Sequence, residues 1–356
     1  MAPEPVAGLI SRAGEGILRD WPHASVSVTR IAGAARTTLR FDAAGIRAVE
    51  DDRARYLVYS LTKTVLALLT LEAVAEHRLG LDADAGPWAA DVPDAGRLTI
   101  RQLLQHTSGL PDYGSVPEYH TAVRAHPSVP WTRAEFLDRS SARILLFEPG
   151  TGWRYSNIGY MIIRGALERI MGESFAEAVA HRVAAPLALT NTSAAVGLDD
   201  LRDLEPGWSR SLAPGDPPDA REPIDVRGRY HPGWVAHGVL GSTSAEIALL
   251  FHKLLSGQLL DASLFGLLTA TVRVGGNHPV FADPCYALGL RADPLAARGA
   301  TFGHTGEGPG YSAAAYHAAG TRSAAPATVA VLCNAECAPV VESLALALLD
   351  EATAAG

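Results

Sequence analysis

Lysine is nearly absent from this chain of 356 residues. Of the 30 lysine and arginine residues, only Lys63 and Lys253 are lysines. Arginine keeps its proton in proteins, whereas a buried lysine can lose its proton and act as a base. Lys63 lies three positions after Ser60, but Lys253 lies three positions after Leu250. A lysine base that serves a neighbouring nucleophile can therefore only be Lys63.

Positive charge is scarce as well. The formal net charge is −8 and the isoelectric point is about 5.8, so no basic stripe is available and nucleic acid is not an expected partner. No apolar run reaches the roughly 18 residues of a membrane-spanning helix, so no membrane partner is expected either. Residues 1–10 lack the basic and apolar stretches of a signal peptide, and we expect a cytoplasmic protein. The sequence does not indicate an oligomeric state.

Cysteine and the common cofactor motifs are rare or missing. The three cysteines form neither a C-x-x-C pair nor an even disulfide set, and we expect ordinary buried thiols at Cys285, Cys333 and Cys337. There is no H-E-x-x-H, Walker or Rossmann motif, so the sequence predicts no metal and no cofactor. Gly310-Tyr311-Ser312 is followed by two alanines, which argues against the nucleophile elbow of α/β-hydrolases.

The apolar pattern predicts strands near both ends of the chain and helices between them. Ser25 to Ile31 and Arg36 to Phe41 alternate apolar and polar residues and are joined at Gly33, as in a β-hairpin. A long helix is expected from Ser60 to about Gly80, apolar almost all round and therefore buried. Ala327 to Leu332 is the clearest later strand. Further helices are expected over residues 98–106, 133–139, 157–171, 242–256 and 340–352.

Residues 195–236 are rich in proline, glycine, aspartate and arginine. They also carry Trp208, Tyr230 and Trp234. This composition predicts a long surface excursion, and such loops are often binding elements or lids. We expect substrate specificity to depend on this loop.

Residues three apart share one face of a helix, so the Ser60 hydroxyl and the Lys63 amine can come within hydrogen-bond reach of each other. The dipole at the helix N-terminus favours a serine alkoxide and disfavours a lysine ammonium. A downward pKa shift of about three units, worth about 4 kcal/mol, makes a lysine a working base at pH 7. Burial and a neighbouring cation are two possible causes of such a shift. The alternative is an ordinary helix with an unrelated serine and a lysine that reaches the surface.

Three short motifs follow one another along the chain: Ser60-Leu61-Thr62-Lys63, Tyr155-Ser156-Asn157 and His304-Thr305-Gly306. With the flanking segments 98–110, 147–160 and 303–311, the chain resembles the penicillin-recognising serine hydrolases from about Ser25 onward. This superfamily includes class C β-lactamases, D-Ala-D-Ala carboxypeptidases, D-aminopeptidases and β-lactamase-like esterases.

The resemblance implies an α/β (α+β) fold of the β-lactamase type. In it, an antiparallel sheet is flanked by helices and interrupted by an all-helical insert. We expect residues 1–85 and 237–356 to form a discontinuous α/β domain. Residues 86–236 are expected to form the insert, including the long loop at about 195–236.

The resemblance also implies roles for individual residues. Ser60 is the expected nucleophile, and Lys63 and Tyr155 are expected to shuttle protons. The phenolate of Tyr155 is favoured if Lys63 and His304 lie close, and His304 occupies the family's place for a cation or donor. The N–H groups of Ser60 and Glu307 are expected to form the oxyanion hole. The residues expected to bind substrate are Asn157, His304, Thr305, Gly306 and Glu307.

These features predict a serine hydrolase that acts through an acyl-enzyme on a small ester, amide or D-configured peptide. An acyltransferase or peptide-cyclising thioesterase would use the same acyl-enzyme. A β-lactamase or D,D-carboxypeptidase is a further alternative, although both act outside the cytoplasm. A catalytically silent binding module has no need for Ser60, Lys63 and Tyr155 together.

Two residues depart from the family pattern. Tyr59 stands before the nucleophile, where a small residue is common, and its ring either narrows the pocket or points into the core. Glu307 places a carboxylate where relatives that bind substrate carboxylates use hydroxyl or cationic groups. We therefore expect weak action on substrates that end in a carboxylate. His106 lies in a similar H-T-S-G string, but we assign it to a structural loop.

Overall fold

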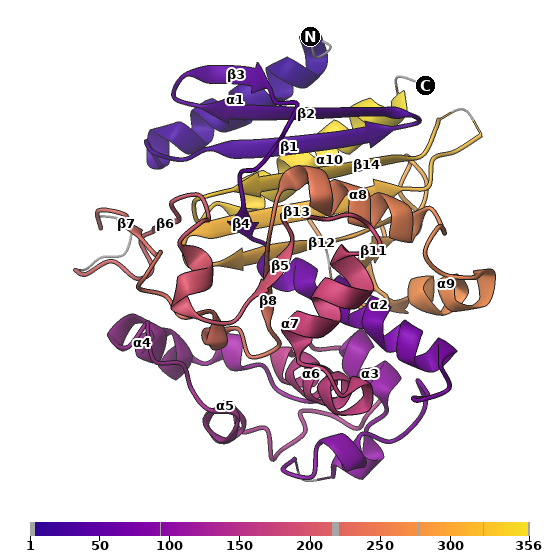
Figure 1. The fold of residues 1–356 in the computed structure, drawn as a ribbon. Helices are drawn as coiled ribbons and strands as arrows, with labels where there is room; N and C mark the ends of the chain where they lie inside the picture. Colours follow the sequence, from indigo (N-terminus) through magenta and orange to yellow (C-terminus); the bar gives the residue numbers. More distant parts are fainter. Residues whose placement is uncertain (1–3, 93, 216–220, 277, 323, 355–356) are drawn as a thin grey trace.

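A computed structural model of the protein describes residues 4–92, 94–215, 221–276, 278–322 and 324–354. Within them, nine strands form one antiparallel sheet that crosses the upper part of the molecule (Figure 1). In spatial order the strands are β3 (Gly45–Ala48), β2 (Ala35–Asp42), β1 (Val26–Ala32), β14 (Ala327–Cys333), β13 (Tyr311–Ala318), β12 (Thr301–Gly308), β11 (Arg291–Asp293), β10 (Cys285–Tyr286) and β9 (Val272–Arg273).

The two ends of the chain meet in this sheet. Strand β1 pairs with β14 from Val26↔Cys333 to Ala32↔Ala327. Strands β1 and β2 form the hairpin that the sequence predicted, with Gly33 in the left-handed region at φ 57°. The expected β-lactamase-like architecture, an antiparallel sheet flanked by helices, is confirmed.

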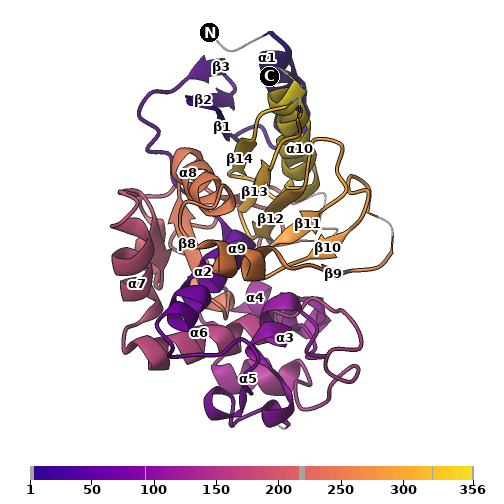
Figure 2. The same cartoon turned by 90° about the vertical axis from the view of Figure 1, so that its right-hand side faces the viewer.

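Helices cover both faces of the sheet (Figure 2). On one face lie α1 (Glu4–Asp20) and α10 (Ala338–Ala354), and on the other lies α8 (Ser244–Leu255). Every residue of β13 and β14 is therefore buried. Helix α1 was not predicted, although its apolar residues follow the helical spacing and pack against the sheet.

The helix predicted from Ser60 is shorter than expected. A 3-10 turn over Tyr59–Leu61 leads into α2 (Thr62–Ala75), and the helix stops before His77, whose φ is 56°. A left-handed residue cannot continue a right-handed helix, which explains why Gly80 was too late an end. The prediction that this helix is buried is confirmed.

The other helices form the lower part of the molecule and the edges of the sheet (Figures 1 and 2). They are α3 (Ile100–Gln105), α4 (Pro117–Ala125), α5 (Arg133–Arg139), α6 (Asn157–Met171), α7 (Phe175–Ala178) and α9 (Ala262–Thr269). The sequence predicted α3, α5 and α6, at residues 98–106, 133–139 and 157–171, but not α4, α7 and α9.

A small second sheet connects the nine-stranded sheet with the lower, helical part of the molecule. It consists of β4 (Tyr56–Leu57), β8 (Val239–Ser242) and β5 (Ser193–Ala195). Residues 86–236 thus contain short strands as well as helices, including β6 (Trp208–Ser209) and β7 (Ile224–Asp225). The division of the chain at residues 86 and 236 stays a prediction.

The prediction of a surface excursion at 195–236 is wrong for the end of this segment. Tyr230 and Trp234 are each only 1% exposed. The Trp234 ring packs against Tyr119 and Trp131, because large aromatic side chains stabilise the fold most when they are buried together. The middle of the segment is held by Glu336, whose carboxylate accepts hydrogen bonds from the hydroxyl and backbone N–H groups of residues 209–211.

All three cysteines are buried free thiols, as predicted. The sulfur atoms of Cys333 and Cys337 lie 3.4 Å apart, across the connection from β14 to α10. No helix in the described part of the chain is both long and apolar enough to cross a membrane.

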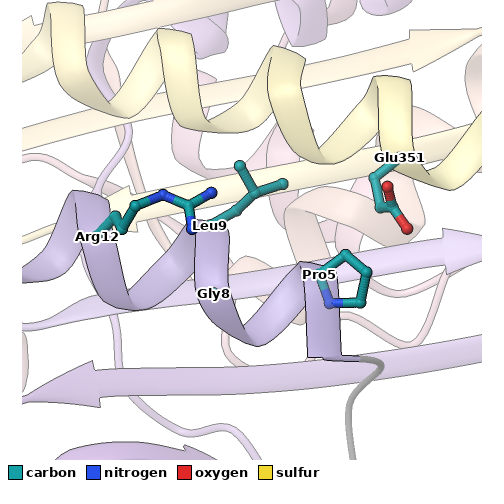
Figure 3. Close-up of a pocket in the computed structure, with 5 residues that line it drawn as sticks. All are labelled: Pro5, Gly8, Leu9, Arg12 and Glu351. Atoms are coloured by element: carbon teal, nitrogen blue, oxygen red, sulfur yellow. The ribbon is translucent and has the colours of Figure 1, made fainter.

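A hollow of about 400 Å³ opens on the surface between α1 and α10 (Figure 3). It is lined by Pro5, Gly8, Leu9, Arg12 and Glu351. None of these is among the residues expected to form the active site.

Candidate active site

The backbone presents Ser60 from a strained turn. The residue before it, Tyr59, has φ 43°, which is unusual for any residue other than glycine. The Tyr59 side chain is buried and its hydroxyl donates to the carbonyl of Pro309 over 2.6 Å. Its ring therefore points into the core, which decides between the two orientations left open by the sequence.

Strand β12 packs directly against this turn. A Cβ atom at Gly306 would lie 2.1 Å from the carbonyl oxygen of Val58, which is too close for any side chain. Gly306 is thus required by the contact between β12 and the serine turn, whatever its part in substrate binding.

The hydroxyl of Ser60 lies between Lys63 and Tyr155. Its Oγ is 2.9 Å from Lys63 Nζ and 2.9 Å from the Tyr155 hydroxyl. Ser60 is half-buried, so it stays accessible to a substrate. Two motifs that are far apart in the sequence therefore meet at one oxygen atom.

Lys63 has no exposed surface. Besides Ser60, its Nζ contacts Asn157 Oδ1 at 2.7 Å and His237 Nε2 at 3.1 Å. Burial lowers the pKa of Lys63 well below its usual value, and the Asp112 carboxylate opposes this shift. The sequence offered burial or a neighbouring cation as the cause, and the structure indicates burial.

Tyr155 is a phenol rather than a phenolate. Burial raises its pKa above the usual value, and the hydrogen bond to Ser60 only partly offsets this. Lys63 does lie close, with Nζ 5.0 Å from the Tyr155 ring centroid. Burial also lowers the pKa values of Lys63 and His304 and so disfavours the cations that would stabilise a phenolate. The phenol form of Tyr155 is thus favoured, and its hydroxyl donates to Ser60.

His304 is neutral for the same reason. Burial lowers its pKa well below the usual range, and the proximity of Lys63 adds to this. Its Nδ1 lies 2.5 Å from the carbonyl oxygen of Thr305, which can only accept, so Nδ1 carries the proton. Its Nε2 then accepts from the Tyr286 hydroxyl at 2.9 Å. The resemblance implied a cation or a donor at this position, and the neutral ring excludes only the cation; the role of His304 in substrate binding stays a prediction.

Asn157 begins helix α6 beside Asp112. Its backbone N–H donates to Asp112 Oδ1 over 2.9 Å, and Ser156 caps the helix by accepting from Gly159 N. The resemblance placed Asn157 among the residues expected to bind substrate, and that role stays a prediction. In the structure its oxygen contacts Lys63.

Thr305 and Glu307 differ in their surroundings. Thr305 Oγ1 accepts from Arg291 Nη1 at 3.0 Å, and Arg291 forms an ion pair with Glu342 at 2.7 Å. Glu307 is exposed, and no ion pair or side-chain hydrogen bond holds it among the described residues. Its charge nevertheless acts on Tyr155, whose pKa it raises slightly after the larger effects of burial and Asp112.

Sequence reasoning missed His237 and Asp112, which belong to no motif of the resemblance. It placed His106 in a structural loop, and this residue proves to support Tyr155, with ring centroids 4.3 Å apart. His106 Nδ1 also accepts from the N–H of Ser156 at 3.1 Å. The only signal for this role in the sequence was that His106 lies within the segment 98–110, which resembles the family.

In the described part of the chain, no group of three or more histidine, cysteine and acidic side chains is placed to hold a metal ion.

Comparison with known proteins identifies similar chains. The family model described as Beta-lactamase matches residues 33–353. The crystal structure of a D-stereospecific amidohydrolase from Streptomyces sp. superimposes with a TM-score of 0.78 at 26% identity, over 99% of this chain and 98% of that one. A D-amino acid amidase from Ochrobactrum anthropi SV3 has the same fold, with a TM-score of 0.77 at 20% identity over 98% and 97% of the two chains.

Curated relatives are matched over a smaller share of their length. A D-aminopeptidase of Gluconobacter oxydans is 27% identical over 252 residues, which are 68% of this chain and 43% of the relative. Esterase EstB of Burkholderia gladioli is 33% identical over 141 residues, or 36% of each protein. These relatives are thus matched over less than half of their own length.

Proposed function

The chain belongs to the β-lactamase family, and from this premise we propose that it is a serine hydrolase that acylates Ser60 with small amide or ester substrates. The observation that carries the proposal is the placement of Ser60 Oγ 2.9 Å from both a buried lysine amine and a tyrosine hydroxyl. The family includes amidases, esterases and peptidases. Amides or short peptides of D-configured amino acids are the substrates that the names of the Streptomyces and Gluconobacter relatives favour.

In the first step, the neutral amine of Lys63 takes the Ser60 proton while Oγ attacks the substrate carbonyl. The new C–O bond turns the carbonyl oxygen into an oxyanion, and Lys63 becomes an ammonium. The Tyr155 hydroxyl then protonates the leaving nitrogen or oxygen as the bond to it breaks, and Lys63 returns a proton to Tyr155. Water repeats the sequence on the ester at Ser60 and releases the acid.

The oxyanion would be held by two backbone N–H groups. Ser60 stands in the first turn before α2, where N–H groups have no acceptor within the helix. Strand β11 pairs with β12 only as far as Gly303, so the edge of residues 304–308 has no neighbouring strand. The hairpin closes at Gly308↔Tyr311, and because hydrogen-bonded pairs alternate with open ones, the N–H of Glu307 faces this edge. Both groups thus serve the expected oxyanion hole.

The test is intact-mass measurement after exposure to a fluorophosphonate and to a panel of activated esters, D-amino acid amides and penicillins. We expect one covalent adduct, located at Ser60 by peptide mapping, and no adduct in Ser60→Ala. The exposed Ser256, which lies outside the site, provides a control variant, Ser256→Ala, that should label like the wild type. Labelling of another serine in Ser60→Ala would overturn the assignment.

Hydrolysis and acyl transfer are distinguished by which molecule, water or another nucleophile, receives the acyl group from Ser60. A hydrolase releases the acid at a rate that added amines change little. An acyltransferase or cyclising thioesterase instead delivers most of the acyl group to an added amine or alcohol, or to the amine of its own substrate. Product analysis with D- and L-configured substrates in parallel also tests the proposed stereochemistry.

A further inference from the structure

His237 is a buried histidine that lies beside the proposed base and that the mechanism above does not use. It is 2% exposed, and its Nε2 lies 3.1 Å from Lys63 Nζ. No motif in the sequence contains it, and it precedes β8, far along the chain from Ser60.

The backbone around His237 is fixed on both sides. The N–H of Ala236 donates to the Tyr113 hydroxyl at 3.1 Å, and the N–H of Gly238 donates to Val235 at 2.8 Å. Gly238 has φ 89°, and a Cβ atom there would lie 2.7 Å from the Phe175 ring, so glycine is required. The imidazole therefore has a defined place next to Lys63.

Strand β8 also ties this segment to the serine turn itself. The N–H of Leu240 donates to Thr62 Oγ1 at 3.2 Å, and the carbonyl of Leu240 accepts from Val58 N at 2.9 Å. His237 and the Ser60 turn are thus held by the same short strand. A shift of one would move the other.

A neutral amine has two N–H groups and one lone pair, arranged tetrahedrally with its carbon. Lys63 meets three polar atoms, and the direction of the lone pair depends on which of them accept. Asn157 turns its amide N–H side toward the Asp112 carboxylate, so its oxygen faces Lys63 and accepts one N–H. The partner of the second N–H then decides where the lone pair points.

We propose that His237 is a positioning residue for the Lys63 base: its Nε2 accepts the second N–H, so that the lone pair points at the Ser60 hydroxyl. This proposal rests on the proposed function, because it assumes that Lys63 deprotonates Ser60. If Nε2 carried a proton instead, it would donate to the lone pair, and Ser60 would face an N–H that cannot accept its proton.

The proposal requires a neutral imidazole with its proton on Nδ1. Burial lowers the pKa of His237 well below its usual value, with smaller contributions from Lys63, Arg164, His304 and His106. The ring is therefore neutral. Nδ1 is buried and has no hydrogen-bond partner among the described residues, so its N–H is left unpaired. The other tautomer avoids this cost, which makes the tautomer a direct test.

Two substitutions separate the acceptor from the volume of the ring. His237→Gln offers an amide oxygen near the place of Nε2, whereas His237→Leu fills similar space without an acceptor. His317→Leu is the matched control, since His317 is a buried histidine on β13 that contacts Thr328 rather than the site. The readout is the second-order rate of Ser60 labelling by a fluorophosphonate, followed by intact mass across pH.

We expect His237→Leu to label about 100-fold more slowly than the wild type, as for other misplaced catalytic groups, and His237→Gln to recover most of this loss. His317→Leu should label at the wild-type rate. The acid limb of the pH profile should move to lower pH in His237→Leu, because an imidazole lone pair stabilises the Lys63 ammonium and raises its pKa. Asp112, which also stabilises this ammonium, is present in all three variants.

Nitrogen-15 NMR of the histidine rings gives an independent answer. Protonated Nδ1 and unprotonated Nε2 at His237 support the proposal, and a proton on Nε2 overturns it. Wild-type rates in His237→Leu, or equal losses in the Gln and Leu variants, overturn it as well. Failure of the wild type to label at Ser60 refutes the proposed function instead, and the NMR spectrum then still decides the tautomer. If the Leu variant does not fold, the Gln variant and the spectrum suffice.

Discussion

Replacing Lys63 by arginine separates a proton acceptor from a positive charge. Both residues carry a cation at low pH, but the guanidinium has no lone pair available and stays protonated. Lys63→Met provides the second comparison, because methionine has a similar length and no charge. If Lys63 acts as a base, the two variants should be almost equally impaired.

The expected loss of acylation rate in the two variants follows from the contacts of the Lys63 amine. Lys63 Nζ is the buried basic atom next to Ser60 Oγ, at 2.9 Å, and Tyr155 is held as a phenol. Loss of one positioned base usually costs about 10² to 10⁴ in rate, or about 3 to 5 kcal/mol of barrier. Arginine is also larger than lysine, and overpacking of a filled site costs about 1 to 3 kcal/mol of stability. The Arg variant should thus be less stable as well as slow.

The assay is single-turnover acylation by an activated ester, measured from about pH 5 to pH 10, with thermal unfolding as the control for folding. Because burial lowers the pKa of Lys63, the neutral amine is present above that lowered pKa. Wild-type acylation should therefore rise as pH increases through it and then level off, and both variants should lack this step. An Arg variant that keeps more than about a tenth of wild-type acylation would show that Lys63 supplies charge rather than a lone pair.

Three further predictions concern the rest of the site. Tyr155→Phe should slow amide substrates by about 10² to 10⁴ but activated esters much less, since a good leaving group needs no acid; equal losses in steady-state assays would contradict this. Glu307→Gln should raise kcat/KM for substrates that end in a carboxylate by about 1.4- to fivefold relative to matched amides, because repulsion at an exposed carboxylate is worth only about 0.2 to 1 kcal/mol. An unchanged preference would remove Glu307 from substrate selection. Burial lowers the folded-state pKa of His237 and His304, so their contribution to stability is present above about pH 6.5 and is lost as pH falls below it, which Tm measurements between about pH 8 and pH 5 should detect.

The parts of the fold that depend on local pattern were predictable. The hairpin of β1 and β2 follows from strict alternation, and α6 lies between a serine cap at Ser156 and Gly172 in the left-handed region. Helix α2 was predicted because its residues are apolar all round. Its C-terminal end was not predicted, because it depends on the left-handed conformation of His77.

The sequence predicted only those residues of the site that belong to the three motifs. Ser60, Lys63 and Tyr155 do meet at hydrogen-bond distance. The charge states were harder, because they depend on burial by distant segments. The sequence favoured a phenolate at Tyr155 if Lys63 and His304 lie close, and the resemblance implied a cation or donor at His304, whereas burial favours the neutral forms of both side chains. His237 could not be found at all, since its place depends on the packing of Trp234 with the aromatic rings of the helical part.

The buried groups around Ser60 are thus arranged to be neutral before the reaction and charged during it. Burial disfavours charge on Lys63, His237 and His304 alike. In the proposed mechanism, the attack of Ser60 forms an ammonium at Lys63 and an oxyanion at the substrate, so opposite charges appear together. The Asp112 carboxyl raises the pKa of Lys63, and the N–H of Asn157 holds it in place before Lys63 takes a proton. A fixed carboxylate needs no reorganisation at the moment of proton transfer, so it stabilises the ammonium more than water could. Burial thus lowers the pKa of Lys63 and favours an amine that can accept a proton, while the Asp112 carboxyl, whose own pKa is raised by burial, opposes this shift and favours the ammonium once it forms.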